Sequence, residues 1–378
     1  MKPAATRALI AMSGGVDSSV AALLCRDAGL DCVGVTMKLF DNDDIYIASD
    51  SDGSWETGRP YMVDPKDSRT CCSLSDADDA ARVCGMLGIP FYVFDFSEDF
   101  RRDVMKRFAG EYAAGRTPNP CIDCNRYVKY GRLYRRMRGL GFDFLVTGHY
   151  ARVERDGVDG RWLLKRAKDE AKDQSYVLYN LTQEQLAHTR FPLGGMNKDE
   201  VRDIAAANGF ANARKRDSQD ICFVPDGRYA DFIESFTGRT WPSGEFVDTD
   251  GHVLGRHKGI IRYTIGQRKG LGSTFGRPMY VVDIRPDANE VVLGVDARLP
   301  AREVKARDIN LIAVPRIDGS MRVTAKIRYN HKDSPAVAEQ TGDDEIALSF
   351  DEPQRAVTHG QAAVLYDGDN VIGGGTIV

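Results

Sequence analysis

The sequence has 378 residues and a net charge of −4, with 42% hydrophobic and 28% charged residues. This length is generous for one domain, so two or three domains are expected, each with its own core. The charge excludes a general polycation, so any nucleic-acid contact must come from local basic patches. No apolar run approaches the ~20 residues of a membrane span, and the first predicted strand starts too early to leave room for a signal peptide. We therefore expect a cytoplasmic protein.

The first predicted feature is a strand, a tight loop and a helix. The apolar run 8–11 predicts a buried strand, and the run of small apolar residues 19–25 predicts a helix that ends near Gly29. Two glycines in the loop allow a ligand to approach the backbone, and serine hydroxyls and the helix N-terminus add donors. The loop is therefore expected to bind phosphate. Its residues are Ala11, Met12, Ser13, Gly14, Gly15, Val16, Asp17 and Ser18.

This loop differs from the two commoner phosphate loops. It lacks the Gly-Lys-Ser/Thr ending of a Walker A loop and the third glycine of the dinucleotide fingerprint. It resembles the pyrophosphate loop (PP-loop) of the ATP pyrophosphatases. That resemblance implies cleavage of ATP between its α and β phosphates, with AMP carried on an acceptor oxygen. A carboxylate at Asp17, among phosphate-facing donors, is best explained by a bound Mg²⁺.

The next predicted elements alternate between strand and helix, which indicates a doubly wound parallel sheet. Ligands of such sheets lie at the carboxyl ends of the strands, where the loop, Met37 and Gly148 are expected to meet. Ser75–Asp78 are expected to cap a helix that stops at Gly88. We interpret residues 41–70 as a long surface insertion. The predicted strands are 31–38, 90–95 and 144–149, and the predicted helices are 75–87 and 98–113.

The sequence pattern changes after about residue 215, from alternating strands and helices to short β-like pieces. Short β-like pieces between Gly, Pro and Asp turns predict a small central β-rich domain, and apolar–polar alternation from about residue 300 predicts a β-barrel. The fold class is therefore α/β plus β. The expected domains are a catalytic ATP-binding domain at 1–215, a central β-rich domain at 216–300 and a C-terminal β-barrel at 301–378.

A second distinctive stretch, 115–125, contains two cysteines. Pro118 and Pro120 are expected to exclude helix and to fix a rigid loop. Cys124 is expected just before a helix, whose dipole would lower the pKa of the thiol. A redox Cys-x-x-Cys pair is the alternative, but the flanking strand of a thioredoxin fold is absent from the pattern.

The predicted helix 126–138 carries six basic residues and three tyrosines with no acid. Cations and aromatic rings together suit an RNA backbone and stacked bases. A solvated helix face is the alternative. Further along the chain, Cys222 follows a basic cluster, and the glycine-flanked basic loop 263–272 suits RNA phosphates.

Six motifs occur in the order typical of one family, over nearly the full length. They are Ser-Gly-Gly-Val-Asp-Ser, Gly-Arg-Thr-Pro-Asn-Pro-x-x-x-Cys-Asn, Thr-Gly-His-Tyr-Ala, Lys-Asp-Gln-Ser-Tyr, Asp-Ser-Gln-Asp-Ile-Cys-Phe and Tyr-Thr-Ile-Gly-Gln-Arg-Lys-Gly-Leu. The chain resembles the bacterial tRNA-specific 2-thiouridylases. That resemblance implies adenylation of the C2 oxygen of the wobble uridine, position 34, in the tRNAs for Lys, Glu and Gln. Sulfur transfer then releases AMP.

The resemblance also implies a role for each matching residue. Residues 11–18, Met37 and Gly148 would hold ATP, Cys124 would be the nucleophile and Cys222 the persulfide carrier. The expected partners are the anticodon stem-loop of tRNA, which the central domain 216–300 is expected to contact, and a protein sulfur donor. The motifs do not determine the oligomeric state, for which a monomer is the expectation. The residues expected to meet the target base are Asn119, Pro120 and Cys121, and those expected to contact tRNA are His149, Lys172, Asp173, Gln174, Arg328, Tyr329 and Gln361.

Cys121 departs from the family pattern, since many members have Asp there. In a persulfide route Cys222 carries the sulfur, Cys124 forms a disulfide with it, and Cys121 is a spectator. In a cluster route Cys121, Cys124 and Cys222 ligate a 4Fe–4S cluster, which Cys121 favours because it completes an all-thiolate set. A zinc site on these thiols is the third alternative. Cys25, Cys32 and Cys84 are expected in the core, and Cys71-Cys72 have no assignment.

Two other functions would also use parts of this pattern. A different ATP pyrophosphatase, amidating or ligating, explains the loop but not the cysteines or the basic helix. A tRNA-binding protein with a vestigial nucleotide site explains the helix but not the complete loop. Pyrophosphate release from ATP, with and without tRNA, separates the three.

Overall fold

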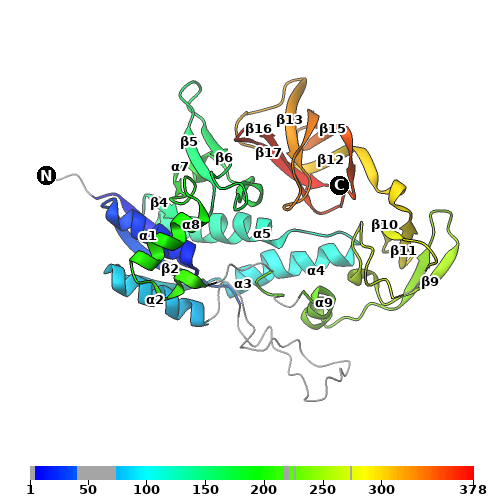
Figure 1. Cartoon of the computed structure of the whole chain (residues 1–378), viewed down its shortest axis with the longest axis horizontal. Helices are drawn as coiled ribbons and strands as arrows, with labels where there is room; N and C mark the ends of the chain where they lie inside the picture. The colour runs from blue at the N-terminus through cyan, green and yellow to red at the C-terminus, as the bar shows by residue number, and fades with distance from the viewer. Residues whose placement is uncertain (1–4, 41–73, 216–220, 225–226, 273–274) are drawn as a thin grey trace, which may run out of the picture. The chain divides into compact units, whose positions relative to one another are not determined.

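A computed structural model describes residues 5–40, 74–215, 221–224, 227–272 and 275–378 (Figure 1). The predicted insertion 41–70, Cys71-Cys72 and the Asp-Ser-Gln-Asp part of the motif before Cys222 lie outside these residues. The chain divides into two compact units. Unit 1 comprises residues 1–104, 121–227 and 369–371, and unit 2 comprises residues 105–120, 228–368 and 372–378.

Unit 1 is built on a parallel sheet with the strand order β3-β2-β1-β4-β7. Its central strand is buried at Ala8, Leu9 and Ile10, as expected for a strand covered on both faces. Chain order reverses between β1 and β4, so a crevice is expected outside their carboxyl ends. The strands are β1 (Arg7–Ala11), β2 (Asp31–Lys38), β3 (Phe91–Asp95), β4 (Phe144–Val146) and β7 (Thr189–Arg190).

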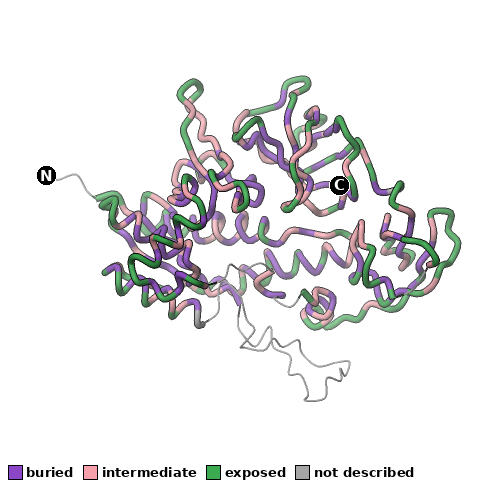
Figure 2. Tube along the Cα trace, viewed as in Figure 1, coloured by how far each residue is buried: buried purple, intermediate pink, exposed green. Residues whose placement is uncertain are grey.

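The helices of unit 1 pack against this sheet through small apolar residues. Val20, Ala21 and Ala22 share one buried cluster with Val83 and Val201. Buried and exposed residues alternate along these helices (Figure 2). The main helices are α1 (Val16–Asp27), α2 (Leu74–Leu87), α3 (Ser97–Phe100), α5 (Pro120–Asp123), α6 (Tyr134–Gly139), α7 (Gln183–Ala187) and α8 (Lys198–Ala207).

Shorter and less regular pieces complete unit 1. Among the described residues of unit 1, η2 (Arg101–Met105) and η3 (Cys124–Leu133) have π geometry, and η4 (Ser175–Leu178) and η5 (Ala211–Arg214) are 3₁₀ turns. The strands β5 (Arg152–Arg155) and β6 (Trp162–Lys165) form an antiparallel hairpin.

The parallel sheet confirms the predicted fold class, but two local predictions are wrong. The fourth strand ends at Val146, so Thr147-Gly148-His149 form a loop at its carboxyl end. Helix α2 begins at Leu74, so Ser75–Asp78 lie inside its first turns rather than capping it. Its predicted stop is confirmed, since Gly88 follows with a φ of +69°.

Unit 2 contains a four-stranded sheet with the order β10-β11-β8-β9. Phe108 of α4 packs on Tyr112, Tyr229 and Phe232, which joins α4 to α9. The elements are α4 (Lys106–Ala113), α9 (Tyr229–Thr237), β8 (Gly244–Val247), β9 (Val253–His257), η6 (Ile260–Arg262), β10 (Tyr280–Arg285), β11 (Glu290–Gly294) and η7 (Asp296–Arg298).

The remainder of unit 2 is an antiparallel barrel with the order β12-β15-β14-β13-β16-β17, closed by pairing of β12 with β17. Val304, Val323, Leu348 and Leu365 fill its core. This closure confirms the predicted C-terminal barrel. The strands are β12 (Pro300–Leu311), β13 (Ser320–Lys326), β14 (Ser334–Gly342), β15 (Glu345–Arg355), β16 (Ala362–Asp367) and β17 (Asn370–Ile377).

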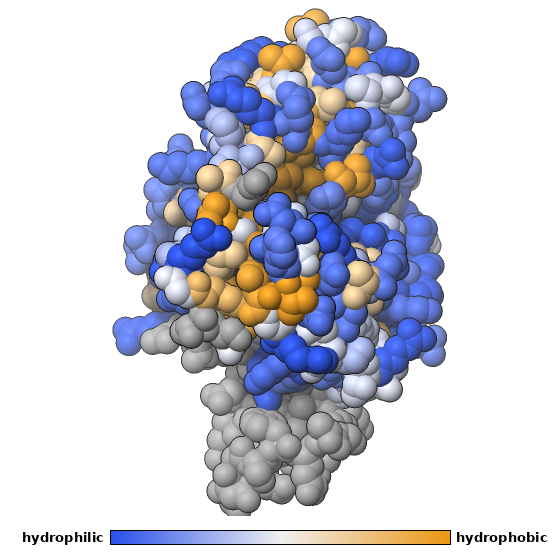
Figure 3. Space-filling view, turned by 90° about the vertical axis from the view of Figure 1, so that its right-hand side faces the viewer, coloured by the Kyte–Doolittle hydropathy of each residue, from blue (hydrophilic) through white to orange (hydrophobic). Residues whose placement is uncertain are grey.

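Some apolar side chains remain exposed. Val253 and Leu254 on the edge strand β9 are examples, and Figure 3 shows apolar patches between hydrophilic side chains on one face. Apolar atoms contribute more than half of the accessible surface of folded proteins in general, roughly 55–60%. Among the described residues, no helix combines the length and apolar character that crossing a membrane requires.

Candidate active site

The predicted phosphate loop lies between β1 and α1 and is held by its own serines. The backbone N–H of Ser13 donates to Oγ of Ser18 at 3.2 Å, and the hydroxyls of Ser18 and Ser19 each donate to the carbonyl of Gly15 at 3.0 Å. Thr36 of β2 donates to the carbonyl of Met12 at 2.8 Å. The loop is therefore fixed in shape, with the N-terminus of α1 directly behind it.

Two glycines permit close packing around this loop. Gly14 has a φ of +70°, and a Cβ atom there would lie 2.4 Å from the carbonyl oxygen of Asp76 in α2. A Cβ atom on Gly148, after β4, would lie 2.8 Å from the backbone nitrogen of Ser18. Gly148 therefore meets the loop at the crevice between β1 and β4, as predicted. Met37 is buried near the carboxyl end of β2.

Asp17 is held by two side chains that the sequence did not single out. Nζ of Lys198 lies 2.8 Å from both carboxylate oxygens, and the hydroxyl of Tyr150 donates to Oδ1 at 2.7 Å. The side chain of Lys198 is 6% exposed, whereas that of Asp17 is 30% exposed. Tyr150 belongs to the Thr-Gly-His-Tyr-Ala motif, and that motif was the sequence signal that could have identified it. Around Lys198 the sequence shows only a helix-capping pattern, which does not indicate a functional residue.

The Lys-Asp-Gln-Ser-Tyr motif supports this arrangement. Asp173 is buried and accepts from the backbone N–H groups of Ala167 at 3.0 Å and Ser175 at 3.2 Å. Gln174 accepts from the N–H of Tyr150 at 3.0 Å and donates its own N–H to the Tyr150 carbonyl at 2.9 Å. Asp173 and Gln174, predicted to contact tRNA, thus bind protein backbone in this structure, and Lys172 beside them is half-buried.

Residues of η5 and its C-terminal side tie the loop to α2. The amide of Asn212 donates to the carbonyl of Gly14 at 3.0 Å and to Oγ of Ser19 at 2.9 Å. Nζ of Lys215 lies 2.6 Å from Asp76 and 2.9 Å from Asp79. Both residues were missed, because the contacts join segments far apart in sequence.

The prediction for the start of the cysteine helix is wrong. The helical stretch begins at Pro120, an allowed first position for proline, so Cys124 lies inside it and not before it. The helix dipole acts mainly on the first turn, where Cys121 lies. Cys121 is exposed, Cys124 is buried and Cys222 is half-buried. From Cys124 the stretch is a π-helix of 10 residues, a rare geometry that is frequent at functional sites.

His149 lies in a buried network beside this helix. Its Nδ1 lies 2.7 Å from Oγ1 of Thr147, and its Nε2 lies 3.5 Å from Nζ of Lys129. Burial and the nearby Lys129 ammonium hold the pKa of His149 well below its ordinary value, so the ring is neutral. His149 was predicted to contact tRNA; the structure places it inside unit 1.

The basic helix is only partly as predicted. Tyr130 and Tyr134 are buried, so these two rings are not available for stacking on RNA bases. Arg132 pairs with Asp99 at 3.0 Å. Arg135, Arg136 and Arg138 of α6 are exposed. A cationic surface therefore remains along α6.

In unit 2, two predicted tRNA residues hold protein segments. Gln361 donates to the carbonyl of Thr117 at 2.7 Å, next to Asn119. Nη2 of Arg328 donates to the carbonyl of Ala356 at 2.7 Å and to Oγ1 of Thr358. Tyr329 is half-buried. The Gln361 contact fixes the loop before Pro120 against the barrel.

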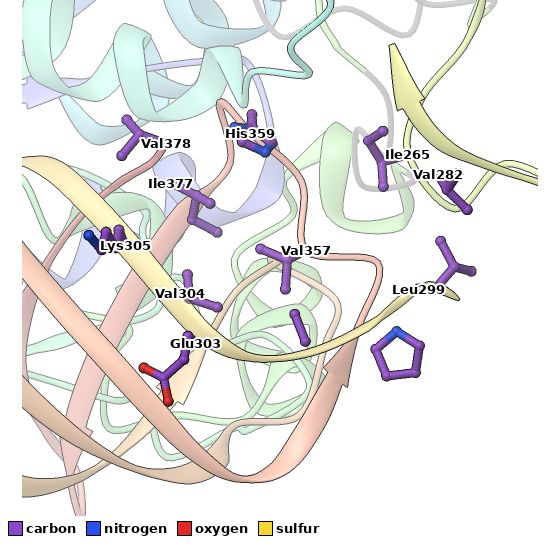
Figure 4. Close-up of a pocket in the computed structure, with 12 residues that line it drawn as sticks. Ile265, Val282, Leu299, Glu303, Val304, Lys305, Val357, His359, Ile377 and Val378 are labelled. Atoms are coloured by element: carbon purple, nitrogen blue, oxygen red, sulfur yellow. The ribbon is translucent and has the colours of Figure 1, made fainter. Parts of the chain in front are cut away.

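Unit 2 also contains a cavity of about 260 Å³ (Figure 4). Its lining includes the apolar residues Leu299, Val304 and Val357 and the polar residues Glu303, Lys305 and His359. It contains none of the predicted site residues, so we assign it no part in the chemistry.

Three family models match the chain. They are described as a tRNA methyl transferase HUP domain (residues 6–226), a tRNA methyl transferase PRC-barrel domain (residues 230–295) and an aminomethyltransferase β-barrel domain (residues 301–377).

Curated relatives extend the match over nearly the full length. The tRNA-specific 2-thiouridylase MnmA of Clostridioides difficile is 49% identical over 371 residues, covering 98% of each chain. The protein of the same name from Lachnoclostridium phytofermentans is 50% identical over 372 residues, covering 98% of this chain and 99% of the relative. Among solved structures, a 4-thiouridine synthetase–RNA complex with bound ATP is 17% identical with a TM-score of 0.35, covering 58% of this chain and 45% of that one. This last likeness is too low to carry an argument.

Proposed function

Because the chain belongs to the family of tRNA-specific 2-thiouridylases, we propose that it thiolates C2 of the wobble uridine, position 34, in the tRNAs for Lys, Glu and Gln. It is an ATP-dependent tRNA sulfurtransferase of the PP-loop type. The observation that carries the proposal is the fixed Ser-Gly-Gly-Val-Asp-Ser loop at the β1–β4 crevice, in the same unit as the helix of Cys124.

The first step is adenylation. The C2 oxygen of uridine is a poor leaving group. It attacks the α phosphate of ATP, and pyrophosphate departs. The oxygen can then leave as part of AMP, which is a good leaving group. Residues 11–18, Met37 and Gly148 would hold the nucleotide, with loop N–H groups and the α1 dipole facing the departing pyrophosphate.

Mg²⁺ fits this site at Asp17. Carboxylate oxygen is the ligand type that Mg²⁺ prefers, and the Asp17 side chain stays 30% exposed beside its two protein partners. A bound ion would neutralise phosphate charge.

The second step is sulfur transfer. In the persulfide route the terminal sulfur on Cys222 attacks C2, and the C2–O bond breaks with AMP leaving. The thiolate of Cys124 then attacks Sγ of Cys222, so the bond between Cys222 and the transferred sulfur breaks. The product keeps that sulfur, and a Cys124–Cys222 disulfide remains for an external thiol to reduce. A protein persulfide is the proposed sulfur source.

The thiol chemistry also fits a 4Fe–4S cluster on Cys121, Cys124 and Cys222. Cys121 and Cys124 lie three residues apart in one helical stretch, a spacing that places two side chains on neighbouring positions. Thiolates are the usual ligands of such clusters, and a cluster would supply an iron that holds sulfide. A zinc site would use the same donors.

Iron and sulfide analysis of anaerobically purified protein distinguishes these routes. A brown protein that loses iron and activity in Cys121→Ser supports the cluster. A colourless, iron-free protein that thiolates tRNA from a persulfide donor rejects it.

Pyrophosphate release from ATP tests the proposed function itself. We expect release that depends strictly on tRNA carrying uridine 34. Release without tRNA would indicate an amidating or ligating ATP pyrophosphatase, and no release in either condition would indicate a tRNA-binding protein.

A further inference from the structure

The carboxylate of Asp17 sits in a loop that is otherwise arranged for phosphate. Next to it lies the ammonium of Lys198, 2.8 Å from both oxygens, on a side chain that is 6% exposed. The hydroxyl of Tyr150 donates to Oδ1 at 2.7 Å. Three donor contacts therefore fix this carboxylate in one orientation.

Both partners of Asp17 are themselves held in place. Lys198 is the first residue of α8, whose start is fixed by a capping box between Asn197 and Glu200. The backbone N–H of Lys198 donates to Asp169 at 3.0 Å. Tyr150 is held by its paired hydrogen bonds to Gln174. The ammonium and hydroxyl thus reach Asp17 from a rigid frame.

The charges around Asp17 affect nucleotide binding directly. A bare carboxylate in a phosphate loop repels a triphosphate, and the repulsion is strong where water is partly excluded. An ammonium 2.8 Å away cancels this charge before the nucleotide arrives. The carboxylate then keeps its orientation without opposing the phosphates.

We propose that Lys198 is a positioning residue for adenylation, which acts through Asp17 by neutralising and orienting its carboxylate at the phosphate loop. This inference rests on the proposed ATP-dependent function. Tyr150 assists by fixing one carboxylate oxygen.

The pairing also changes how Asp17 variants must be interpreted. Removing Asp17 alone leaves the buried ammonium of Lys198 without its carboxylate, which destabilises a fold. Removing Lys198 alone leaves the carboxylate facing the nucleotide. The double variant Asp17→Asn/Lys198→Met removes both charges. It therefore distinguishes the effect of an uncompensated charge beside the nucleotide from the effect of a disrupted phosphate loop.

The test is ATP binding to the full-length protein by calorimetry without tRNA and without Mg²⁺, so that Asp17 acts only as a charge beside the phosphates, with melting temperatures recorded for each variant. Lys198→Met should weaken ATP binding by about tenfold or more, and Lys198→Arg should recover part of the loss. Asp17→Asn/Lys198→Met should bind ATP more tightly than Lys198→Met, which a merely structural role would not produce. Lys168→Met is the matched control, because Lys168 is exposed and pairs with Glu200 near the same helix start. It should bind ATP like the wild type.

Wild-type affinity in Lys198→Met would overturn the inference, as would a double variant that binds no more tightly than Lys198→Met. If Lys198→Met does not fold, Tyr150→Phe takes its place: loss of one hydroxyl should weaken ATP binding, and unchanged affinity would overturn the inference. The proposed function fails separately, if the wild type releases no pyrophosphate in the presence of tRNA.

Discussion

Cys25, Cys32 and Cys84 show how far single residues can be interpreted from sequence. Each lies in an apolar run, and each is buried as predicted. Burial raises the pKa of these thiols to about 12, 11 and 12, respectively. They therefore remain protonated thiols under ordinary conditions, unlike cysteines that react.

We predict that these three cysteines resist iodoacetamide at pH 8 in the folded protein and react fully in denaturant. Mass spectrometry of peptides after timed labelling measures this, with exposed Cys121 as the reactive reference. Labelling of Cys84 in the folded protein at the rate of Cys121 would contradict the assignment.

His149 links one residue to the stability of unit 1. Its pKa lies well below the ordinary value when folded, because of burial and Lys129. The unfolded chain binds a proton near pH 6.5 and the folded one does not, so stability falls as pH drops below that value.

We predict that lowering the pH from 7 to 5 costs the wild type roughly 1–2 kcal/mol more than it costs His149→Gln. Urea unfolding at both pH values measures the difference. Comparison with the variant removes contributions from His257 and His331, whose pKa values are also lowered. An equal loss in both proteins would show that His149 does not titrate in this way.

At the scale of elements, the basic helix shows where a pattern misleads. The sequence shows that this helix carries six cations, but its composition does not predict which of its side chains are accessible. The π geometry from Cys124 adds about one residue per turn, so α-helical spacing misplaces its faces. Tyr130 is therefore buried, and Arg132 pairs with Asp99.

We predict that Arg135→Gln/Arg136→Gln weakens tRNA binding and reduces the slope of log affinity against log salt by roughly one for each phosphate that no longer meets a cation. Arg132→Gln is the control with a smaller expected effect, since its cation is already paired. Filter binding at several salt concentrations measures both quantities. Unchanged affinity and slope would place the RNA elsewhere.

The loop after β4 offers a second test at this scale. A Cβ atom on Gly148 would lie 2.8 Å from backbone atoms of the phosphate loop, so Gly148→Ala must displace the phosphate loop. We predict that ATP affinity falls by about tenfold or more and that stability falls by roughly 1–3 kcal/mol. Gly195→Ala is the control, because nothing lies within 4 Å of a Cβ there. Calorimetry that finds equal affinities would separate Gly148 from the nucleotide.

For the whole molecule, strand–helix alternation was enough to predict the parallel sheet, and apolar–polar alternation was enough for the barrel. The strand order and the partners of Asp17 were not predictable, because Lys198 and Tyr150 lie 181 and 133 residues away in the chain. The proposed domains 1–215, 216–300 and 301–378 stay a proposal, supported by family-model matches that end near the same positions.

The central claim is that this chain places sulfur on C2 of uridine 34. Purified protein is incubated with unmodified tRNA for Glu, ATP, Mg²⁺ and a persulfide donor, and the digested nucleosides are analysed by mass spectrometry. We predict 2-thiouridine that requires ATP, is lost in Cys124→Ser and maps to position 34. Full tRNA-dependent consumption of ATP without any 2-thiouridine, or thiolation at another position, would contradict it.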